Sequence, residues 1–402
     1  MSEWIEKTID EMIAVNPSIP LTKGQSYPFI DIDKVERHNK FVTNVEERIF
    51  DGQGGSRFQS GDTVFSRITP CLENRKIAKV KICEKSIGFG STEFFVFRNK
   101  NGKTDSEFTH YLVSSDVVVL PAINSMTGAS GRQRADSKFI KRLRIKFPPL
   151  PIQKQIGEIL SAYDDAIENN SRRIVLLEKA AQELYKEWFV RFRFPRHETA
   201  KFESGLPKGW EIKRLADFGR IETGKTPPMD NPANYGDEIM FIKTPEMHNK
   251  IFIIKTEEYL SQKGHQTQPK KLLPPNSIMV SCIGSGGIVS LNAKEAHTNQ
   301  QINSIIPTDK RFVEWLYFTC KGLKETIELF GATGTTMTNL SKGKFERLKV
   351  ICPLKDLITA FHEKVNVILK QIKTLIYQNQ NLTCQRDLLL PRLMSGKTEV
   401  KN

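Results

Sequence analysis

One stretch of the chain carries a pattern that proteins use to bind nucleotide phosphates. Residues 219–226 read Gly-Arg-Ile-Glu-Thr-Gly-Lys-Thr and match the phosphate-binding loop GxxxxGK[ST] at every position. A working loop of this kind leads directly into a helix whose backbone N–H groups face the phosphates. Here prolines follow at 227, 228 and 232, so no helix can continue from Thr226. The same Gly, Lys and Thr chemistry suits a loop that contacts a DNA backbone or base, which is the interpretation we prefer.

Other catalytic and metal-binding patterns are absent from the sequence. Residues 284–287 (Gly-Ser-Gly-Gly) are not a GxGxxG dinucleotide motif, and the seven histidines form no HExxH pair. Residues 273–276 (Leu-Pro-Pro-Asn) lack the Asn/Asp-Pro-Pro-aromatic motif of amino-methyltransferases. The six cysteines are scattered without a CxxC pair, so neither a zinc site nor a disulfide framework is indicated. We therefore expect no catalytic residue, metal or cofactor in this chain.

Basic side chains gather in three segments, at residues 67–85, 132–146 and 342–349. Such clusters suit phosphate contacts, while Asn, Gln and Arg beside them can read adenine and guanine edges. A charge cluster can also be no more than a solvated face. The candidate DNA contacts are Arg67, Thr69, Asn74, Lys76, Thr92, Arg132, Arg134, Lys225, Thr226, Ser285, Asn299, Gln300, Gln301, Thr336 and Lys342.

The composition agrees with a polyanionic partner and argues against several protein classes. The 402 residues are 39% hydrophobic and 26% charged, and 60 Lys+Arg against 46 Asp+Glu give a net charge of +14. That excess favours nucleic acid or an anionic surface. No apolar run approaches the roughly 20 residues of a membrane span, and the N-terminus does not resemble a signal peptide. We expect a cytoplasmic protein with reduced thiols and no membrane partner.

Two segments have the periodicity of long helices. Apolar residues recur at steps of three and four from Ile152 to Trp188 and again from Leu357 to Leu382, which is a heptad pattern. Each stripe must be buried, either against the other helix as a coiled coil or on its own globular domain, and the matched patterns favour the coiled coil. Each helix would be roughly 55 Å long. The predicted seam residues are Ile156, Ile159, Tyr163, Ile167, Asn170, Ile174, Leu177, Leu184, Val365, Ile368, Ile372, Leu375, Asn379 and Leu382.

An internal repeat of about 205 residues organises the rest of the chain. Thr-Gly-Ala-Ser at 127–130 and Arg-Leu-Arg-Ile at 142–145 correspond to Thr-Gly-Thr-Thr at 333–336 and Arg-Leu-Lys-Val at 347–350. The order is therefore domain, helix, domain, helix, with an approximate two-fold relation. We assign residues 1–150 and 210–354 to the two domains, 151–190 and 355–395 to the spacer helices, and 191–209 to a connector.

Short β-rich runs dominate both domains. Residues 63–68, 76–82 and 93–97 read as strands in the first, and 239–242, 277–281 and 301–306 in the second. The clearest helix within a domain is predicted at 312–329. Each domain is thus expected to be α+β, with polar loops long enough to bind a partner.

The whole chain resembles the DNA-specificity (S) subunit of type I restriction–modification enzymes. The resemblance rests on Phe-Pro-Pro-Leu-Pro-Ile-Gln at 147–153, Leu-Tyr-Lys-Glu-Trp-Phe at 184–189, Leu-Pro-Lys-Gly-Trp at 206–210 and Asp-Leu-Leu-Leu-Pro-Arg-Leu-Met-Ser-Gly at 387–396. Residues 61–74 also resemble one common subtype of target-recognition domain. Two departures are Lys355-Asp356 in place of Pro-Ile-Gln, and the lack of a Leu-Pro-x-Gly lead before Trp4.

The resemblance implies a division of labour among subunits. Each target-recognition domain would read one half of a split, asymmetric site in double-stranded DNA, and the helices would set the spacer and dock two methyltransferase subunits. Those subunits would carry S-adenosylmethionine, and restriction subunits would add ATP- and Mg-dependent translocation and cleavage. The alternative from another class is a helical scaffold whose globular ends bind proteins, without a specific DNA site. A nucleotide-binding enzyme built on residues 219–226 remains a third, disfavoured hypothesis.

Overall fold

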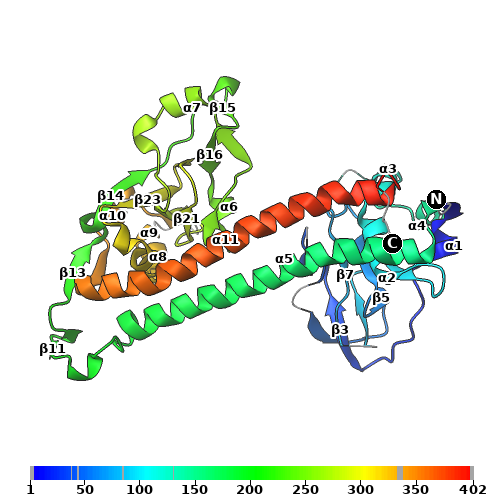
Figure 1. Cartoon of the computed structure of the whole chain (residues 1–402), viewed down its shortest axis with the longest axis horizontal. Helices are drawn as coiled ribbons and strands as arrows, with labels where there is room; N and C mark the ends of the chain where they lie inside the picture. The colour runs from blue at the N-terminus through cyan, green and yellow to red at the C-terminus, as the bar shows by residue number, and fades with distance from the viewer. Residues whose placement is uncertain are drawn as a thin grey trace. The chain divides into compact units, whose positions relative to one another are not determined.

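The computed structural model describes residues 4–37, 39–42, 45–83, 86–129, 131–332 and 338–398. The chain divides into two compact units, which are described separately here (Figure 1). Unit 1 comprises residues 1–169 and 379–402, and unit 2 comprises residues 170–378. Each unit contains one globular domain together with a part of each of the two long helices.

Among the described residues, the globular domain of unit 1 contains two four-stranded sheets and four short α-helices. Its antiparallel sheet has the order β2 (Ile13–Val15), β9 (Phe94–Asn99), β6 (Thr63–Ser66), β7 (Ile77–Lys79). Its mixed sheet has the order β4 (Glu46–Ile49), β3 (Ser26–Ile30), β8 (Ile87–Gly90), β5 (Ser56–Gln59), with β3 and β8 parallel. The other elements are β1 (Ile5–Thr8) paired with β10 (Arg144–Phe147), α1 (Ile9–Met12), α2 (Ser106–Ser114), α3 (Asp116–Asn124) and α4 (Ser137–Arg142).

Unit 2 repeats this plan. Its larger sheet has the order β14 (Gly219–Thr223), β23 (Ile302–Pro307), β19 (Ile278–Ser281), β21 (Val289–Asn292), β17 (Phe252–Ile253). Its mixed sheet has the order β15 (Tyr235–Gly236), β18 (Glu258–Leu260), β16 (Ile239–Ile242), β22 (Ala296–Thr298). The helices are α6 (Thr244–Met247), α7 (Gln262–Gln266), α8 (Val313–Gly322), α9 (Lys324–Gly331) and α10 (Lys342–Glu346). Three strand pairs complete it: β11 (Phe202–Glu203) with β12 (Leu206–Pro207), β13 (Glu211–Arg214) with β25 (Lys349–Cys352), and β20 (Ile283–Gly284) with β24 (Thr338–Asn339).

The two domains share topology as well as sequence motifs. The pair β1–β10 corresponds to β13–β25, and the parallel pair β3–β8 corresponds to β16–β22. The helix run α2, α3, α4 likewise corresponds to α8, α9, α10. The internal repeat and the α+β class that the sequence predicts are therefore confirmed.

The two long helices are α5 (Leu150–Tyr185), continued by a π-helical turn at Lys186–Val190, and α11 (Lys355–Met394). Proline at 151 lies in the first turn of α5, where its missing N–H costs nothing. Pro391 lies inside α11, which continues to Met394. Helix α11 begins immediately after Pro353-Leu354, just as α5 begins after Pro148-Pro149. The second helix thus starts at the equivalent place although Lys355-Asp356 stands where the first copy has Pro-Ile-Gln.

The helices run antiparallel. In unit 1, Asp164 and Ile167 of α5 bond to Arg386 and Asn379 of α11, so the numbering of the two helices runs in opposite directions. In unit 2, Tyr185 and Trp188 at the end of α5 pack on Phe361 near the start of α11.

None of the fourteen predicted seam residues is exposed. Ile156, Asn170, Val365, Ile372 and Leu375 are buried, and the others are half-buried. Asn379 Nδ2 donates to the Ile167 carbonyl at 3.3 Å. Leu160 and Leu369 lie outside the heptad pattern but are buried beside the seam.

A buried ionic network joins the helices to the globular domain of unit 1. The Asp164 carboxylate accepts from the Tyr111 hydroxyl of α2 and from the Arg386 guanidinium of α11, and Arg386 also pairs with Asp387 at 2.8 Å. The Asp164 and Arg386 side chains are only 5% and 10% exposed. Removing one side chain of this network leaves a buried charged or polar group without one of its partners, which is strongly destabilising.

Arg386→Ala is expected to lower the free energy of unfolding by about 3–5 kcal/mol because Asp164 then stays buried without its counter-charge. Combining Tyr111→Phe, Asp164→Leu and Arg386→Met should recover most of this loss, since no charge is left unpaired. Urea denaturation measures both, with exposed Arg392→Ala on the same helix as the control. A cost below 1 kcal/mol for Arg386→Ala would contradict the role given to this network.

Candidate nucleic-acid interface

In unit 1, five of the predicted DNA contacts meet at one edge of the antiparallel sheet. The segments 67–69 and 133–135 form a short ladder: Thr69 N donates to the Gln133 carbonyl at 3.0 Å, and Ala135 N donates to the Arg67 carbonyl at 2.8 Å. The Arg67 N–H also reaches the carbonyl of Glu93 at the start of β9. We call this surface edge 1, and it comprises Arg67, Thr69, Thr92, Glu93, Arg132, Gln133 and Arg134.

Arg134 is held on edge 1 by a carboxylate. Its Nε lies 3.0 and 2.9 Å from the two Glu93 oxygens, and its Nη2 lies 2.6 Å from Oε1. The hydrogen bond from Arg134 is the main cause that lowers the pKa of Glu93, and the reverse contact raises the pKa of Arg134. Nearby, the Arg67 guanidinium lies 5.1 Å from the Phe95 ring centroid.

Asn74 and Lys76 are placed differently from the other candidates of unit 1. Asn74 is exposed on the turn that joins β6 to β7. The Lys76 ammonium donates to the Ile32 carbonyl at 3.0 Å, so its charge is directed at the chain's own backbone.

In unit 2, five further candidates meet at the corresponding edge. The Thr226 hydroxyl donates to Gln300 Oε1 at 2.7 Å, and Asn299 Nδ2 donates to Gln301 Oε1 at 3.1 Å. Lys225 N donates to the Thr298 carbonyl at 2.9 Å, and the Lys225 side chain is exposed. We call the surface of Lys225, Thr226, Asn299, Gln300 and Gln301 edge 2. It presents amide and hydroxyl groups with one cation.

Gly224 allows edge 2 to form. A Cβ at this position would lie 2.2 Å from the Asn299 carbonyl oxygen and 2.3 Å from that of Thr298. Between Thr226 and Pro232 the chain has no helix, as the prolines predict. Residues 219–226 therefore form a strand, β14, and a loop that closes against residues 298–302, instead of a phosphate-binding turn before a helix.

Two of the described candidates of unit 2 lie outside edge 2. Ser285 is exposed in a separate cavity of about 620 Å³, whose lining includes His248, Asn249 and Lys324. Lys342 lies on α10 and forms an ion pair with Glu346 at 3.6 Å. Thr336 lies outside the described residues.

Each domain is attached to a long helix through a glutamate at the same place. Glu107 is the second residue of α2, and its Oε2 accepts from the Ser161 hydroxyl of α5 at 2.9 Å. Glu314 is the second residue of α8, and its Oε2 lies 2.7 Å from Nδ1 of His362 on α11. The surroundings differ: burial raises the pKa of Glu314, whereas for Glu107 burial is outweighed by Lys79 and Lys40, which lower its pKa to about 2.

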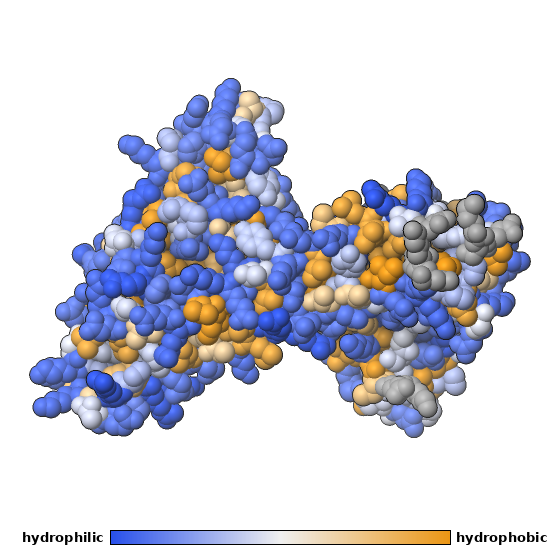
Figure 2. All heavy atoms as spheres, in the orientation of Figure 1, coloured by the Kyte–Doolittle hydropathy of each residue, from blue (hydrophilic) through white to orange (hydrophobic). Residues whose placement is uncertain are grey.

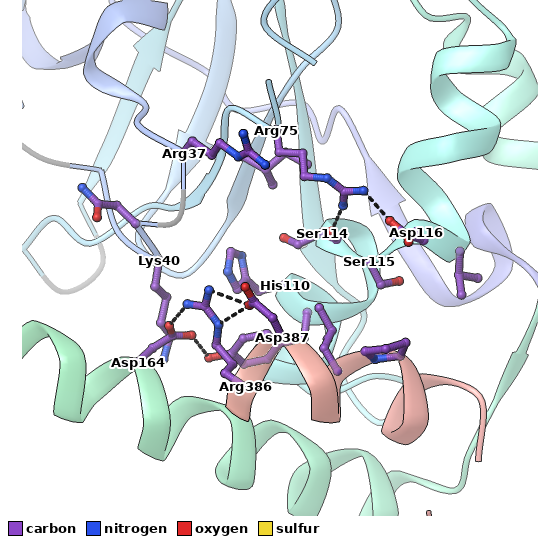
Figure 3. Close-up of a pocket in the computed structure, with 16 residues that line it drawn as sticks. Arg37, Lys40, Arg75, His110, Ser114, Ser115, Asp116, Asp164, Arg386 and Asp387 are labelled. Carbon is purple, nitrogen blue, oxygen red and sulfur yellow. Dashed lines mark hydrogen bonds and ion pairs between the residues drawn. The ribbon is translucent and has the colours of Figure 1, made fainter. Parts of the chain in front are cut away.

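Beside the Glu107 attachment, unit 1 contains a cavity of about 350 Å³ (Figure 3). Figure 3 shows Arg386 and Asp164 on the two long helices at one side and the Arg75–Asp116 pair at the other. His110 lies between them, and burial together with the nearby cations lowers its pKa to about 3. The cavity is thus lined by groups that already bond to one another, which indicates a structural junction.

The structure adds residues that the sequence did not single out. Glu93 and Gln133 join edge 1, and Thr244 joins edge 2 by donating to Gln301 Oε1 at 3.2 Å. The bridge that brings Ile68 to Arg134 connects segments 66 residues apart, so no local pattern could have indicated it. For Glu93, the only signal was its position beside Thr92.

The visible face of each unit is mainly hydrophilic, with apolar patches between charged side chains (Figure 2). Apolar side chains exposed on the long helices include Val175 and Leu176 on α5 and Val367 and Leu388 on α11. In the part of the chain that the structure describes, no helix is long and apolar enough to span a membrane. Within those same residues, no three His, Cys, Asp or Glu side chains are grouped so that they could hold a metal ion.

Comparison with known proteins agrees with this architecture. Residues 1–179 and 207–383 match the family described as type I restriction modification DNA specificity domain. The chain belongs to this family. It is 30% identical to the type I restriction enzyme HindI specificity subunit of Haemophilus influenzae, over 99% of this chain and all of that protein. It is also 26% identical to the MjaIX specificity subunit of Methanocaldococcus jannaschii, over 76% of this chain and 72% of that protein.

A solved structure supports the fold. The type I restriction-modification S subunit from M. genitalium superimposes with a TM-score of 0.60 over all of this chain and 97% of that one, at 14% identity. The chain is therefore a type I specificity subunit in family and fold, and the predicted class of non-catalytic subunit is confirmed.

Gly224→Ala is expected to weaken DNA recognition through edge 2 by about 5- to 150-fold, because overpacking of 1–3 kcal/mol must push residues 298–299 away from β14. Competition binding with the DNA that the wild-type complex selects measures the change. Gly322→Ala is the matched control, since a Cβ there meets no atom within 4 Å. Wild-type affinity in Gly224→Ala would show that edge 2 is not a recognition surface.

Proposed function

We propose that each globular domain reads one half of a split, asymmetric site in double-stranded DNA, edge 1 one half and edge 2 the other. The observation that carries the proposal is that two domains of the same topology place different side chains at corresponding edges. Edge 1 carries three arginines, whereas edge 2 carries amides, a hydroxyl and one lysine. Two domains of similar fold that present different side chains to DNA suit a site whose two halves differ in sequence.

We further propose that the antiparallel helices act as the spacer ruler and as the dock for two methyltransferase subunits. The exposed apolar residues Val175, Leu176, Val367 and Leu388 are the surface available for such docking. The methyltransferase subunits would carry S-adenosylmethionine and methylate adenine in each half-site. Restriction subunits would supply the ATP- and Mg-dependent steps, in the cytoplasm where the DNA lies.

A scaffold that binds only proteins is the competing function, and DNA selection separates the two. The full chain, with its partner methyltransferase, is expected to produce methylated adenines within one two-part motif in genomic DNA. Affinity should also fall steeply with salt, because several Lys and Arg side chains displace counterions from phosphates.

Exchanging residues 1–147 for another recognition domain is expected to change one half of that motif and to leave the other half and the spacer as they were. The physical reason is that edge 1 and edge 2 are built within separate units. Sequencing of methylated adenines from cells carrying the exchanged chain measures this. If both halves changed, or if the unaltered chain selected no two-part motif, the proposed function would fail.

Deleting residues 172–175 from α5 is expected to shorten the spacer or to prevent assembly, with both half-site sequences unchanged. Four residues are about one helical turn and about 6 Å, which is close to two base-pair steps. The control is Arg173→Ala, which changes an exposed side chain of the same segment and keeps the length, the seam and the exposed apolar residues. Full activity on the original spacing after the deletion would refute the ruler.

A further inference from the structure

Arg134 is the most strongly oriented cation on edge 1. Glu93 takes its Nε–H and one N–H of Nη2, at distances between 2.6 and 3.0 Å. The other terminal nitrogen, Nη1, has only a 3.5 Å contact with the Arg132 carbonyl. A guanidinium has five N–H donors, so the end of the fork keeps donors on both Nη1 and Nη2.

The position of this pair suits contact with a base. The Arg134 side chain remains 43% exposed although Glu93, at 21%, holds it. Its backbone is fixed on both sides, because it forms β-bridges with Ile68 and with Thr127. Holding the side chain and backbone in advance lowers the entropy that binding would otherwise cost.

Among the described residues, the corresponding place in unit 2 has no such pair. Gln301 directly precedes β23 as Glu93 directly precedes β9, and Asn339 pairs with Ile283 as Arg134 pairs with Ile68. Gln301 and Asn339 are both uncharged. A charged side chain that could contact a base at this place is therefore a feature of the first domain.

We propose that Arg134 reads a guanine in the half-site bound by edge 1, donating from Nη1 and Nη2 to O6 and N7, and that Glu93 is its positioning residue. This proposal rests on the proposed function. Guanine is the base whose major-groove edge offers two adjacent acceptors, which a bidentate arginine matches. A phosphate would also accept from Arg134, but it carries no sequence information.

The experiment uses the full chain assembled with its methyltransferase and a pool of duplexes randomised across both half-sites. Arg134→Ala is expected to lower the preference for guanine at one position of one half-site by about 5- to 150-fold. Arg134→Lys keeps the charge but loses the fork, so it should recover affinity and not the guanine preference. All other positions should keep the wild-type base.

Glu93→Gln tests the positioning role. It should weaken the preference at that same position, and it should have no additional effect in an Arg134→Ala background, because Glu93 acts through Arg134. Arg311→Ala is the matched control: Arg311 and Asp309 form a similar two-point pair at 3.0 and 2.6 Å, after the far end of β23. It should leave every position of the motif unchanged.

The outcomes are distinct. If the wild-type complex selects a two-part motif and Arg134→Ala only weakens binding uniformly and reduces its salt dependence, Arg134 contacts phosphate and the inference is wrong while the function stands. If Glu93→Gln still changes the motif without Arg134, Glu93 reads a base itself and the positioning role is wrong. If the wild-type complex selects no motif, the proposed function fails first. Should Arg134→Ala not assemble, Arg134→Lys alone decides, because retained guanine preference would overturn the inference.

Discussion

The attachment of each recognition domain to a long helix is the constraint on which DNA reading depends. Glu107 and Glu314 occupy the same place in α2 and α8 and bond to Ser161 and His362 on the long helices. An edge can present side chains to a particular base only if its domain is held rigidly on the element that spans the site. Glu314 is buried and Glu107 is half-buried, so rotation of either domain would take a carboxylate away from its partners, which is costly. In unit 1 the Tyr111–Asp164–Arg386 network adds a second such attachment.

The repeat separates what must stay constant from what can vary. The order of the first four strands of the larger sheet, the parallel strand pair and the three-helix run are shared by both domains, and they pack in cores of apolar side chains. The edges, in contrast, use residues that begin or follow strands, where side chains are not needed for the core. Glu93 and Gln301 show this clearly: each directly precedes an inner strand of its sheet, yet Glu93 holds an arginine and Gln301 bonds to neutral partners. The side chains at the edges can therefore differ between the two domains while the shared framework stays the same.

The sequence predicted the architecture better than the site. Long apolar periodicity located α5 and α11, and β-rich runs located β6, β9, β16, β19 and β23 within a residue or two. The predicted helix at 312–329 is instead two helices, α8 and α9, because the chain breaks at Gly322 and Leu323. The mixed sheet of unit 1 was missed since β3, β4 and β5 are short and partly exposed, without a clear alternation. The partners within each edge come from bridges between segments far apart in the chain, and residue types alone do not reveal such pairs.

The basic side chains of the chain are divided between the interior of the fold and the two edges. A net charge of +14 would suit a protein that grips phosphates along its whole surface. Yet Lys76 bonds to a carbonyl, Lys40 and Lys79 neutralise Glu107, and Arg386 neutralises Asp164. These four cations are thus engaged inside the fold, and Lys40, Lys79 and Arg386 pair with carboxylates where the globular domain of unit 1 meets the long helices. Among the cations at the edges, Arg134 is held in place by Glu93, which favours discrimination between bases over nonspecific binding. In the proposed assembly, the methyltransferase subunits would supply much of the nonspecific binding to DNA.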